Sequence, residues 1–369
     1  MRIDRVRLHD FRNIAAMELS LCDGANIIYG QNGQGKTNLI EALWLFTGAK
    51  SFRGARDAQL VRFGQPQAAL EAAFFAGERD QEATLTIESR RTATLNGVPL
   101  KAPSELAGRF CAVVFSPSHL SLIKNGPAEK RRFLDTSICQ LKPRFLHVLA
   151  QYQRALDQRN RLLKDVAYET SLFDTLDIWD AHLASYAAVV VKTRASYLEK
   201  LGPFARGIYA GISGEKERLD FRYVPTLGGD AEGEIPELEE RMRAALRAGR
   251  GEDVRARITT AGPHRDDVDI TLDGQSARAY GSQGQQRSCV LALKLAECEM
   301  MRETLGEYPV VLLDDVMSEL DVARRDYLLN SLSGRQLVIT CCDDAIFRNL
   351  DRGLGVRVED GRAVELTHY

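Results

Sequence analysis

The sequence lacks the features that mark membrane and secreted proteins. Nowhere do about 18 apolar residues follow one another, so we expect no membrane-spanning helix. The first residues, MRIDRVRLHDFRNI, alternate charged with apolar side chains and lack the apolar core of a signal peptide. Seven cysteines are present without a CxxC pair, and we expect them to be reduced and mostly buried. These absences predict a cytoplasmic protein.

A strong net charge is also missing. The formal charge is −2 at pH 7, which gives no global argument for a nucleic-acid partner. The charge is unevenly spread, however, because residues 121–165 contain ten Lys/Arg against four Asp/Glu, and residues 230–240 contain six acidic residues and no basic one. Solvated surface and a basic binding face both explain such runs. Aromatic and basic residues do not interleave as they do in proteins that stack single-stranded bases.

Three kinds of segment follow one another along the 369 residues. Residues 1–118 are rich in alternating, strand-like stretches, one of which contains the hairpin pair Asn96-Gly97. Residues 119–255 are rich in Leu, Ala, Arg, Gln and Glu with helical periodicity, but no heptad repeat persists. Strand alternation returns in residues 256–369. We therefore expect an α/β core in two parts, interrupted by a mainly helical lobe.

The stretch GQNGQGKT fits the phosphate-loop pattern GxxxxGK[ST] and has the required context, with a strand-like ANIIYG before it and a helical stretch after it. Backbone N–H groups of such a loop form an anion nest at a helix N-terminus. Lys36 supplies a positive charge to the phosphates, and the Thr37 hydroxyl is a magnesium ligand. The predicted ATP-binding residues are Gly30, Gln31, Asn32, Gly33, Gln34, Gly35, Lys36 and Thr37.

The stretch PVVLLDDVMSELD supplies the acidic complement of this loop. Its apolar residues predict a buried parallel strand whose carboxyl end carries Asp314 and Asp315. We expect Asp314 to hold magnesium together with Thr37, and Asp315 to orient the attacking water as a catalytic residue beside Lys36. An exposed acidic pair at a strand end is the alternative.

A second Gly-rich loop, Gly281 to Gly284 in the stretch YGSQGQQR, precedes an expected helix whose apolar residues include Val290, Leu291, Leu293 and Leu295. Ser282 is suited to cap that helix, which alone would explain the loop. Its hydroxyl and the free N–H groups of the first turn are equally suited to receive a phosphate. A loop of this kind is weak evidence by itself, and its value comes from its place before the Asp-Asp strand.

The order of these motifs resembles ABC-type ATPase heads of the SMC class and, within that class, the RecF family. The resemblance runs along nearly the whole chain and is weakest in the helical lobe after Arg144. It rests on LHDFRNI (Leu8 to Ile14), YGQNGQGKTNLIEALW (Tyr29 to Trp44), KRRFLD (Lys130 to Asp135), TTAGPHRDDVDI (Thr259 to Ile270), SQGQQRSCVLALKLAE (Ser282 to Glu297) and VVLLDDVMSELD (Val310 to Asp321).

The resemblance implies an α/β fold, an ABC-type P-loop ATPase head with an inserted, mainly helical second lobe. It also implies the cofactors ATP and Mg²⁺ and an ATP-dependent homodimer with the nucleotide between two heads. The signature loop, Ser282, Gln283, Gly284 and Gln285, would then contact the ATP of the partner. Ser318 and Asp321, in the stretch SELD that forms the D-loop, would lie near the interface of the two heads. Arg12 is either a nucleotide contact or a surface arginine.

The resemblance further implies double-stranded DNA and ssDNA–dsDNA junctions as partners, together with RecR and RecO, in recombinational repair. Lys124, Lys130, Arg131 and Arg132 are candidate contacts to DNA phosphates, but Arg131 and Arg132 could instead pair with Glu129 or Asp135 on a helix surface. Such contacts predict sequence-independent, salt-dependent binding.

Some positions depart from the pattern of ABC heads. Ser118 and His119 replace acidic residues, Thr340 occupies the place of a switch histidine, and Asp315 is shorter than the usual Glu. The shorter carboxylate and the missing switch histidine predict slow ATP hydrolysis suited to a switch, and the resemblance implies a weak, DNA-stimulated ATPase. An SMC-like structural ATPase of chromosome organisation is the alternative function, although the chain lacks a long coiled coil.

Overall fold

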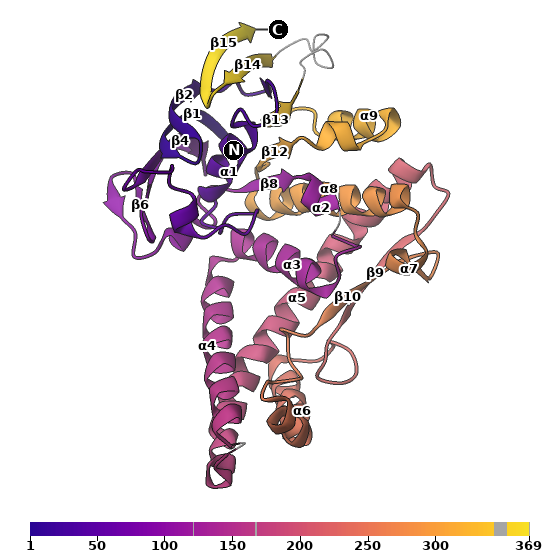
Figure 1. The fold of residues 1–369 in the computed structure, drawn as a ribbon. Coiled ribbons are helices and arrows are strands. Elements are labelled where there is room, and N and C mark those ends of the chain that lie inside the picture. Colours follow the sequence, from indigo (N-terminus) through magenta and orange to yellow (C-terminus); the bar gives the residue numbers. More distant parts are fainter. Residues whose placement is uncertain (121, 167, 343–352, 369) are drawn as a thin grey trace. The chain divides into compact units, whose positions relative to one another are not determined.

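The structure is a computed structural model, which describes residues 1–120, 122–166, 168–342 and 353–368. The chain divides into two compact units, shown in Figure 1. We call Met1–Ser121 with Val290–Tyr369 the head unit, and Leu122–Cys289 the lobe unit. An α/β core formed by both ends of the chain and interrupted by a mainly helical segment is therefore confirmed.

The head unit contains an antiparallel sheet near the N-terminus. In spatial order its strands are β2 (Ile14–Ser20), β1 (Arg2–Phe11), β4 (Ala68–Ala76), β5 (Arg79–Ile87), β6 (Arg91–Leu95) and β7 (Val98–Pro99). In β4 every second residue is buried, as expected for a strand with one face on the core. The hairpin predicted at Asn96-Gly97 joins β6 to β7.

The second sheet of the head unit is mainly parallel and carries the predicted motifs. Its order is β15 (Arg362–His368), β14 (Gly353–Glu359), β3 (Ala25–Tyr29), β13 (Leu337–Cys341), β12 (Val310–Asp314) and β8 (Ala112–Phe115), with only β15 antiparallel to its neighbour. The central strands β12 and β13 are buried at every residue, because both faces of a parallel sheet are covered.

Short helices connect the strands of the head unit. They are α1 (Lys36–Leu45), η1 (Asp57–Gln59), η2 (Pro103–Leu106), α2 (Pro117–Leu120), η4 (Val316–Glu319) and α9 (Val322–Ser331). Helix α1 is buried over nearly its whole length, with Leu39, Ile40 and Leu43 inaccessible to solvent. This burial fixes the N-terminal end of α1 at the carboxyl end of β3.

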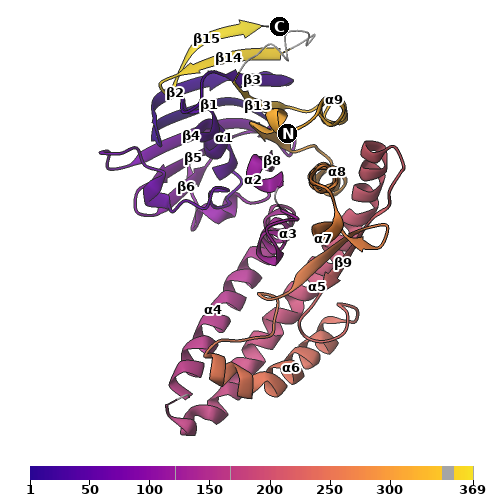
Figure 2. The same cartoon turned by 45° about the vertical axis from the view of Figure 1, so that its right-hand side comes forward.

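Long helices dominate the lobe unit, as Figure 2 shows for α4, α5 and α6. Its elements are α3 (Pro127–Leu141), α4 (Pro143–Val166), η3 (Thr170–Thr175), α5 (Leu176–Ser213), β9 (Leu219–Val224), α6 (Ile235–Ala256), β10 (Asp267–Leu272), β11 (Gln275–Ser276), α7 (Ala277–Tyr280) and the start of α8 (Gln283–Leu305). No described helix combines the length and apolarity of a membrane span.

The lobe unit extends further along the chain than the predicted range 119–255. Residues 256–289 belong to it and not to the head unit. The physical reason is strand pairing, because β10 pairs with β9 over six residues, from Asp267 opposite Val224 to Leu272 opposite Leu219. Strand β9 itself lies between two helical stretches, and its partner is more than forty residues away in sequence, so local periodicity gave no hint of the pair.

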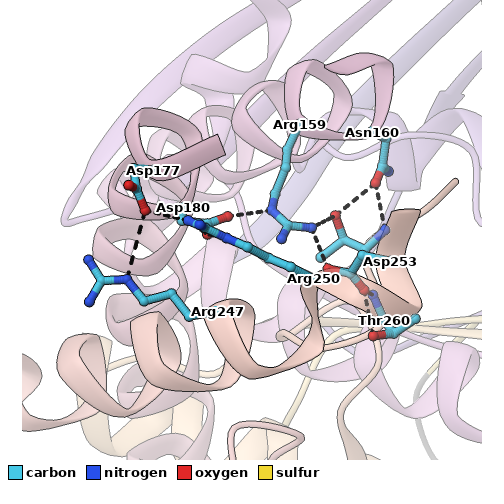
Figure 3. Close-up of polar contacts among 9 residues, drawn as sticks. Arg159, Asn160, Asp177, Asp180, Arg247, Arg250, Asp253 and Thr260 are labelled. Carbon is cyan, nitrogen blue, oxygen red and sulfur yellow. Dashed lines mark hydrogen bonds and ion pairs between the residues drawn. The ribbon is translucent and has the colours of Figure 1, made fainter. Parts of the chain in front are cut away.

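A buried network of charged side chains joins the three long helices of the lobe (Figure 3). Arg159 of α4 is inaccessible to solvent and donates to Asp180 of α5 at 2.6 Å and to Asp253 of α6 at 2.6 Å. Arg250 donates to the second oxygen of Asp180 at 2.9 Å from Nε. Since each carboxylate has a cationic partner, this network holds α4, α5 and α6 in one arrangement.

We expect Arg159→Leu to lower the free energy of unfolding by about 3–5 kcal/mol, because it leaves the carboxylate of Asp253 buried without its cation. Arg161→Leu changes an exposed residue of the same helix and should shift stability by less than about 0.5 kcal/mol. Urea unfolding followed by circular dichroism measures both. Equal stability of the two variants would show that the network adds nothing to the lobe.

Candidate nucleotide-binding site

The predicted phosphate loop lies between β3 and α1. Gly30, Gly33 and Gly35 adopt φ angles of 147°, 83° and 109°, which other residues rarely adopt. A Cβ on Gly35 would lie 2.9 Å from the side-chain oxygen of Asn13, so glycine is also required sterically. No side chain caps the N-terminus of α1, and its first N–H groups are therefore available to an anion.

Lys36 lies beneath this loop with its side chain almost fully buried. Its ammonium group donates to the main-chain oxygens of Gly30 at 2.7 Å and Gln31 at 2.9 Å. These contacts bring the positive charge to the mouth of the loop, where Gln31 and Asn32 are exposed. The loop thus combines aligned N–H groups with one fixed cation, which is the chemistry that binds phosphate groups.

Thr37 and Asp314 meet at the carboxyl ends of the parallel strands. The Thr37 hydroxyl donates to Oδ1 of Asp314 at 2.8 Å, although the two residues are far apart in sequence. Thr340, at the end of β13, donates to the same oxygen at 3.0 Å and accepts from the main-chain N–H of Asp315 at 2.9 Å. Thr340 therefore fixes both aspartates.

The hydroxyl of Thr37 and the carboxylate of Asp314 are hard oxygen ligands of the kind that Mg²⁺ prefers. Among the described residues, no three His, Cys, Asp or Glu side chains gather into a site that would hold a metal alone. Mg²⁺ usually keeps several waters and is completed by substrate phosphates, so these two ligands beside a phosphate loop fit it. The residues present are thus compatible with magnesium.

Burial raises the pKa of Asp314, which is 5% exposed, above its usual range. A raised folded-state pKa means that the protonated form adds stability below the unfolded pKa of about 3.9, and that this stability is lost as pH rises through the folded pKa. We therefore expect Asp314→Asn, which still accepts from Thr37, to stabilise the nucleotide-free protein at neutral pH.

Thermal unfolding between pH 4 and pH 8 measures this effect. The melting temperature of the wild type should fall relative to that of Asp314→Asn as pH rises above the unfolded pKa, about 3.9. Magnesium should stabilise the wild type with ATP and have little effect on the variant. A variant that is less stable than the wild type at pH 7 would contradict a cost of burying this charge.

Arg12 lies at the turn between β1 and β2, with φ of 57°. Its guanidinium donates to both oxygens of the buried Glu41 at 2.9 and 3.0 Å and to the main-chain oxygen of Gln59 at 3.0 Å. Arg12 is therefore fixed by α1, and it lines a hollow of about 610 Å³ with Arg53 and Arg62. Whether Arg12 contacts the nucleotide or is a surface arginine stays a prediction.

Hydrogen bonds connect this hollow with the phosphate loop. Asn13 donates to the main-chain oxygen of Gly33 at 3.0 Å and accepts from Asn38 at 2.7 Å, whose oxygen accepts from Arg53 at 2.9 Å. Sequence reasoning missed Asn13, Asn38 and Arg53. The basic loop KSFRGAR after α1 was the available hint, but nothing in it shows which residues face the phosphate loop.

The C-terminal hairpin supports the phosphate loop from another side, and no motif predicted it. The N–H of Gly361 donates to the main-chain oxygen of Gln34 at 2.9 Å. The N–H of Asp360 donates to the side-chain oxygen of Gln34 at 2.5 Å. A Cβ on Gly361 would lie 2.6 Å from the oxygen of Asn13. The pair Asp360-Gly361 between alternating stretches was the overlooked sequence hint of this hairpin.

The signature-loop residues Ser282 to Gln285 belong to the lobe unit. Ser282 caps α8, because its Oγ accepts from the N–H of Gln285 at 3.2 Å while Oε1 of Gln285 accepts from the N–H of Ser282 at 2.7 Å. Gln283 and Gly284 start the helix. The capping role is thus present, and the predicted contact with a partner's nucleotide stays a prediction.

The D-loop residues have local hydrogen bonds in the head unit. Ser318 donates to the main-chain oxygen of Asp315 at 2.8 Å, and Asp321 caps α9 by accepting from the N–H of Arg324 at 3.0 Å. This hydrogen bond, followed by the ion pair with Arg324, lowers the pKa of Asp321. Next to β8, Ser118 and His119 both approach the hydroxyl of Ser116, at 2.8 and 3.1 Å.

The four candidate DNA contacts differ in position. Lys124 and Arg132 are exposed. Lys130 is buried and its ammonium contacts Asp267 at 2.7 Å, which does not suit a contact with DNA. Arg131 donates to the main-chain oxygen of Asp266 at 2.6 Å and lies partly buried.

For Arg131 the structure differs from the alternative pairing with Glu129 or Asp135, whereas for Arg132 that pairing stays a prediction. Asp135 accepts two hydrogen bonds from Arg194 of α5, at 2.7 and 2.8 Å. Arg131 instead points to the loop before β10. The KRRFLD motif therefore joins α3 to other elements of the lobe through Lys130, Arg131 and Asp135, and only Arg132 of its basic residues is exposed.

A family model described as the RecF/RecN/SMC N-terminal domain matches residues 2–364. The DNA replication and repair protein RecF of Agathobacter rectalis is 42% identical over 345 residues, which are 92% of each chain. The protein of that name from Acetivibrio thermocellus is 38% identical over 366 residues, 98% of this chain and 99% of that one. The chain belongs to the RecF family.

Solved structures agree with this membership. One described as "the recombination mediator protein RecF-ATPrS in RecFOR pathway" is 35% identical, with a TM-score of 0.92 over 98% of this chain and 97% of that one. A Smc head domain from Pyrococcus furiosus, at 17% identity and a TM-score of 0.55, shares the fold alone. The predicted ABC-type P-loop ATPase head with an inserted helical lobe is thus confirmed for this RecF-family chain.

Proposed function

We propose that this RecF-family protein is an ATP-dependent DNA-binding switch in recombinational DNA repair and replication-fork maintenance. The observation that carries the proposal is the junction of the phosphate loop with the acidic strand, where Thr37 donates to Asp314 and the neighbouring Lys36 donates to main-chain oxygens of the loop. ATP binding is further supported by the relatives described as RecF-ATP and RecF-ATPrS, at 34% and 35% identity.

In this proposal the phosphate loop holds the nucleotide. The N–H groups around Gly33 and Gly35 bind the phosphates, and Lys36 turns from its carbonyl partners to the β- and γ-phosphates. Thr37 and Asp314 hold magnesium, which neutralises phosphate charge when it is bound. The hollow beside Asn13, lined by Arg12 and Arg53, receives the remainder of the nucleotide.

Hydrolysis depends on Asp315. It follows Asp314 at the end of β12, and its backbone is fixed in the left-handed region, with φ of 52°, by Thr340 and Ser318. From there its carboxylate orients and activates the attacking water. The short carboxylate of Asp315, and Thr340 in place of a switch histidine, favour slow turnover of ATP. Slow hydrolysis limits how long the ATP-bound state lasts and does not drive movement.

In this proposal the protein switches between a monomer and an ATP-bound dimer. ATP bound to one copy is contacted by the signature loop of the other, Ser282 to Gln285, and the D-loop residues Ser318 and Asp321 lie near the seam. The dimer forms on gapped or junction duplex DNA, with exposed Lys124 and Arg132 among the phosphate contacts. RecR and RecO are the proposed partners, in keeping with the RecFOR pathway named for the solved relatives. We propose that the protein acts in the cytoplasm.

Sizing by light scattering tests the proposal. The chain of 41.1 kDa should double its mass with ATP and not with ADP, and its retention of a labelled gapped duplex should rise in the same samples. Lys36→Ala, which removes the phosphate cation, should do neither. ATP-independent dimers with full DNA affinity would favour the SMC-like structural role instead, and a lasting monomer would reject the switch.

A further inference from the structure

A chain of hydrogen bonds connects helix α5 with the signature loop inside the lobe unit. The hydroxyl of Tyr209, near the end of α5, donates to Oε2 of Glu217 at 2.6 Å. Oε1 of Glu217 accepts from the side-chain amide of Gln285 at 2.5 Å. The oxygen of that amide accepts from the N–H of Ser282 at 2.7 Å. Three side chains thus connect α5 with the main-chain N–H of Ser282 at the N-terminus of α8.

Glu217 is the fixed point of this chain. Its neighbours in sequence are Lys216 and Arg218, and all three line the same surface hollow of about 400 Å³. Yet both of its carboxylate oxygens accept hydrogen bonds from neutral donors, a phenol and an amide. Tyr209 is 1% exposed, so its hydroxyl is held in place by packing. Hydrogen bonds to a carboxylate are stronger than neutral ones, which makes the position of Gln285 well defined.

The acceptor-only chemistry of Glu217 also sets the orientation of Gln285. A carboxylate can receive only the NH₂ end of the amide, so the oxygen of Gln285 must face the N–H of Ser282. This leaves three donors of the loop for an outside ligand, namely the Ser282 hydroxyl and the N–H groups of Gln283 and Gly284, which lie in the first turn of α8 and have no carbonyl partner within the helix. Glu217 therefore decides which donors the loop presents.

We infer that Glu217 is a positioning residue for the signature loop, and that it ties the conformation of this loop to α5. It does not touch the nucleotide. It holds Gln285, and through it Ser282, so that the remaining donors of the loop converge on the γ-phosphate of ATP bound to a second copy. This inference rests on the proposed function for the identity of the ligand, whereas the positioning itself is a property of the lobe unit alone.

Hydrogen exchange of the full-length protein without nucleotide tests the positioning. In Glu217→Ala the N–H of Ser282 should exchange about tenfold faster, since it loses an oriented acceptor. Glu217→Gln keeps one acceptor oxygen for Gln285 and should restore most of the protection. Tyr209→Phe, which keeps the buried ring, should give an intermediate rate, and the control Glu215→Gln on the same turn should match the wild type. Unchanged exchange in Glu217→Ala would overturn the inference.

Light scattering tests the consequence. The ATP concentration that gives half of the dimer should rise about tenfold in Glu217→Ala and be restored by Glu217→Gln, whereas ATP affinity of the monomer should not change because the phosphate loop lies in the head unit. Altered exchange with normal dimerisation would reject the link to ATP. If the wild type itself never dimerises with ATP, the proposed function fails, and the exchange rates still decide whether Glu217 positions the loop.

Discussion

Asp315→Asn is expected to lower the turnover of ATP at least about 100-fold, which is the lower end of what a general base contributes. The substitution removes the carboxylate that activates water but keeps the shape of the side chain. The backbone is also preserved, because asparagine tolerates the left-handed conformation found here, with φ of 52°. The N–H of residue 315 keeps its bond to Thr340, 2.9 Å long in the wild type.

Because the phosphate loop and Asp314 are unchanged, the variant should still bind ATP and should accumulate as the ATP-bound dimer. Phosphate release measures turnover, and light scattering after ATP addition measures how long the dimer persists. Asp326→Asn, an exposed change on α9, is the matched control and should behave as the wild type in both assays. Wild-type turnover in Asp315→Asn would assign the activation of water to another group.

The core of the site was predictable from the sequence because its parts are local motifs. The pattern from Gly30 to Thr37 predicts a loop and the first turn of a helix, and the short apolar run before Asp314 favours a buried strand. Parallel strands place their carboxyl ends on one edge, so the meeting of Thr37 with Asp314, at 2.8 Å, follows from two stretches of about ten residues.

The surroundings of the site were not predictable, because they depend on pairs distant in sequence. The hairpin of β14 and β15 reaches Gln34 through Asp360 and Gly361, and no local pattern shows that these turns meet. The same holds for Glu41, a charged residue inside a buried helix, whose partners Arg12 and Arg53 come from loops on either side. Long-range packing, and not local propensity, selects these contacts.

The basic residues of the sequence did not all prove to be exposed. Lys130 and Arg131 are adjacent members of a basic run, yet one is buried against Asp267 and the other donates to a main-chain oxygen. Arg159, near the end of the same run, lies at the centre of the lobe network. The excess of positive charge in residues 121–165 therefore overstates the basic surface, and the DNA contacts must be sought among its exposed members.

Ser282→Arg is expected to abolish ATP-induced dimerisation while the monomer keeps its affinity for ATP. Ser282 is exposed at the start of α8, so the larger side chain can be accommodated in the monomer. In the proposed dimer the same side chain would occupy the place of the partner's γ-phosphate. Light scattering with ATP, and ATP binding by calorimetry at protein concentrations below dimerisation, measure the two properties.

Two control variants distinguish a block of dimerisation from the loss of the helix cap and from the mere addition of an arginine. Ser282→Ala removes the helix cap, seen in the 3.2 Å bond from the N–H of Gln285, and should cost about 1 kcal/mol of stability and weaken the dimer without abolishing it. Ser185→Arg adds the same side chain on the exposed face of α5 and should dimerise normally. If Ser282→Arg dimerises like Ser185→Arg, the loop does not meet the partner's ATP, and capping α8 would be its whole role.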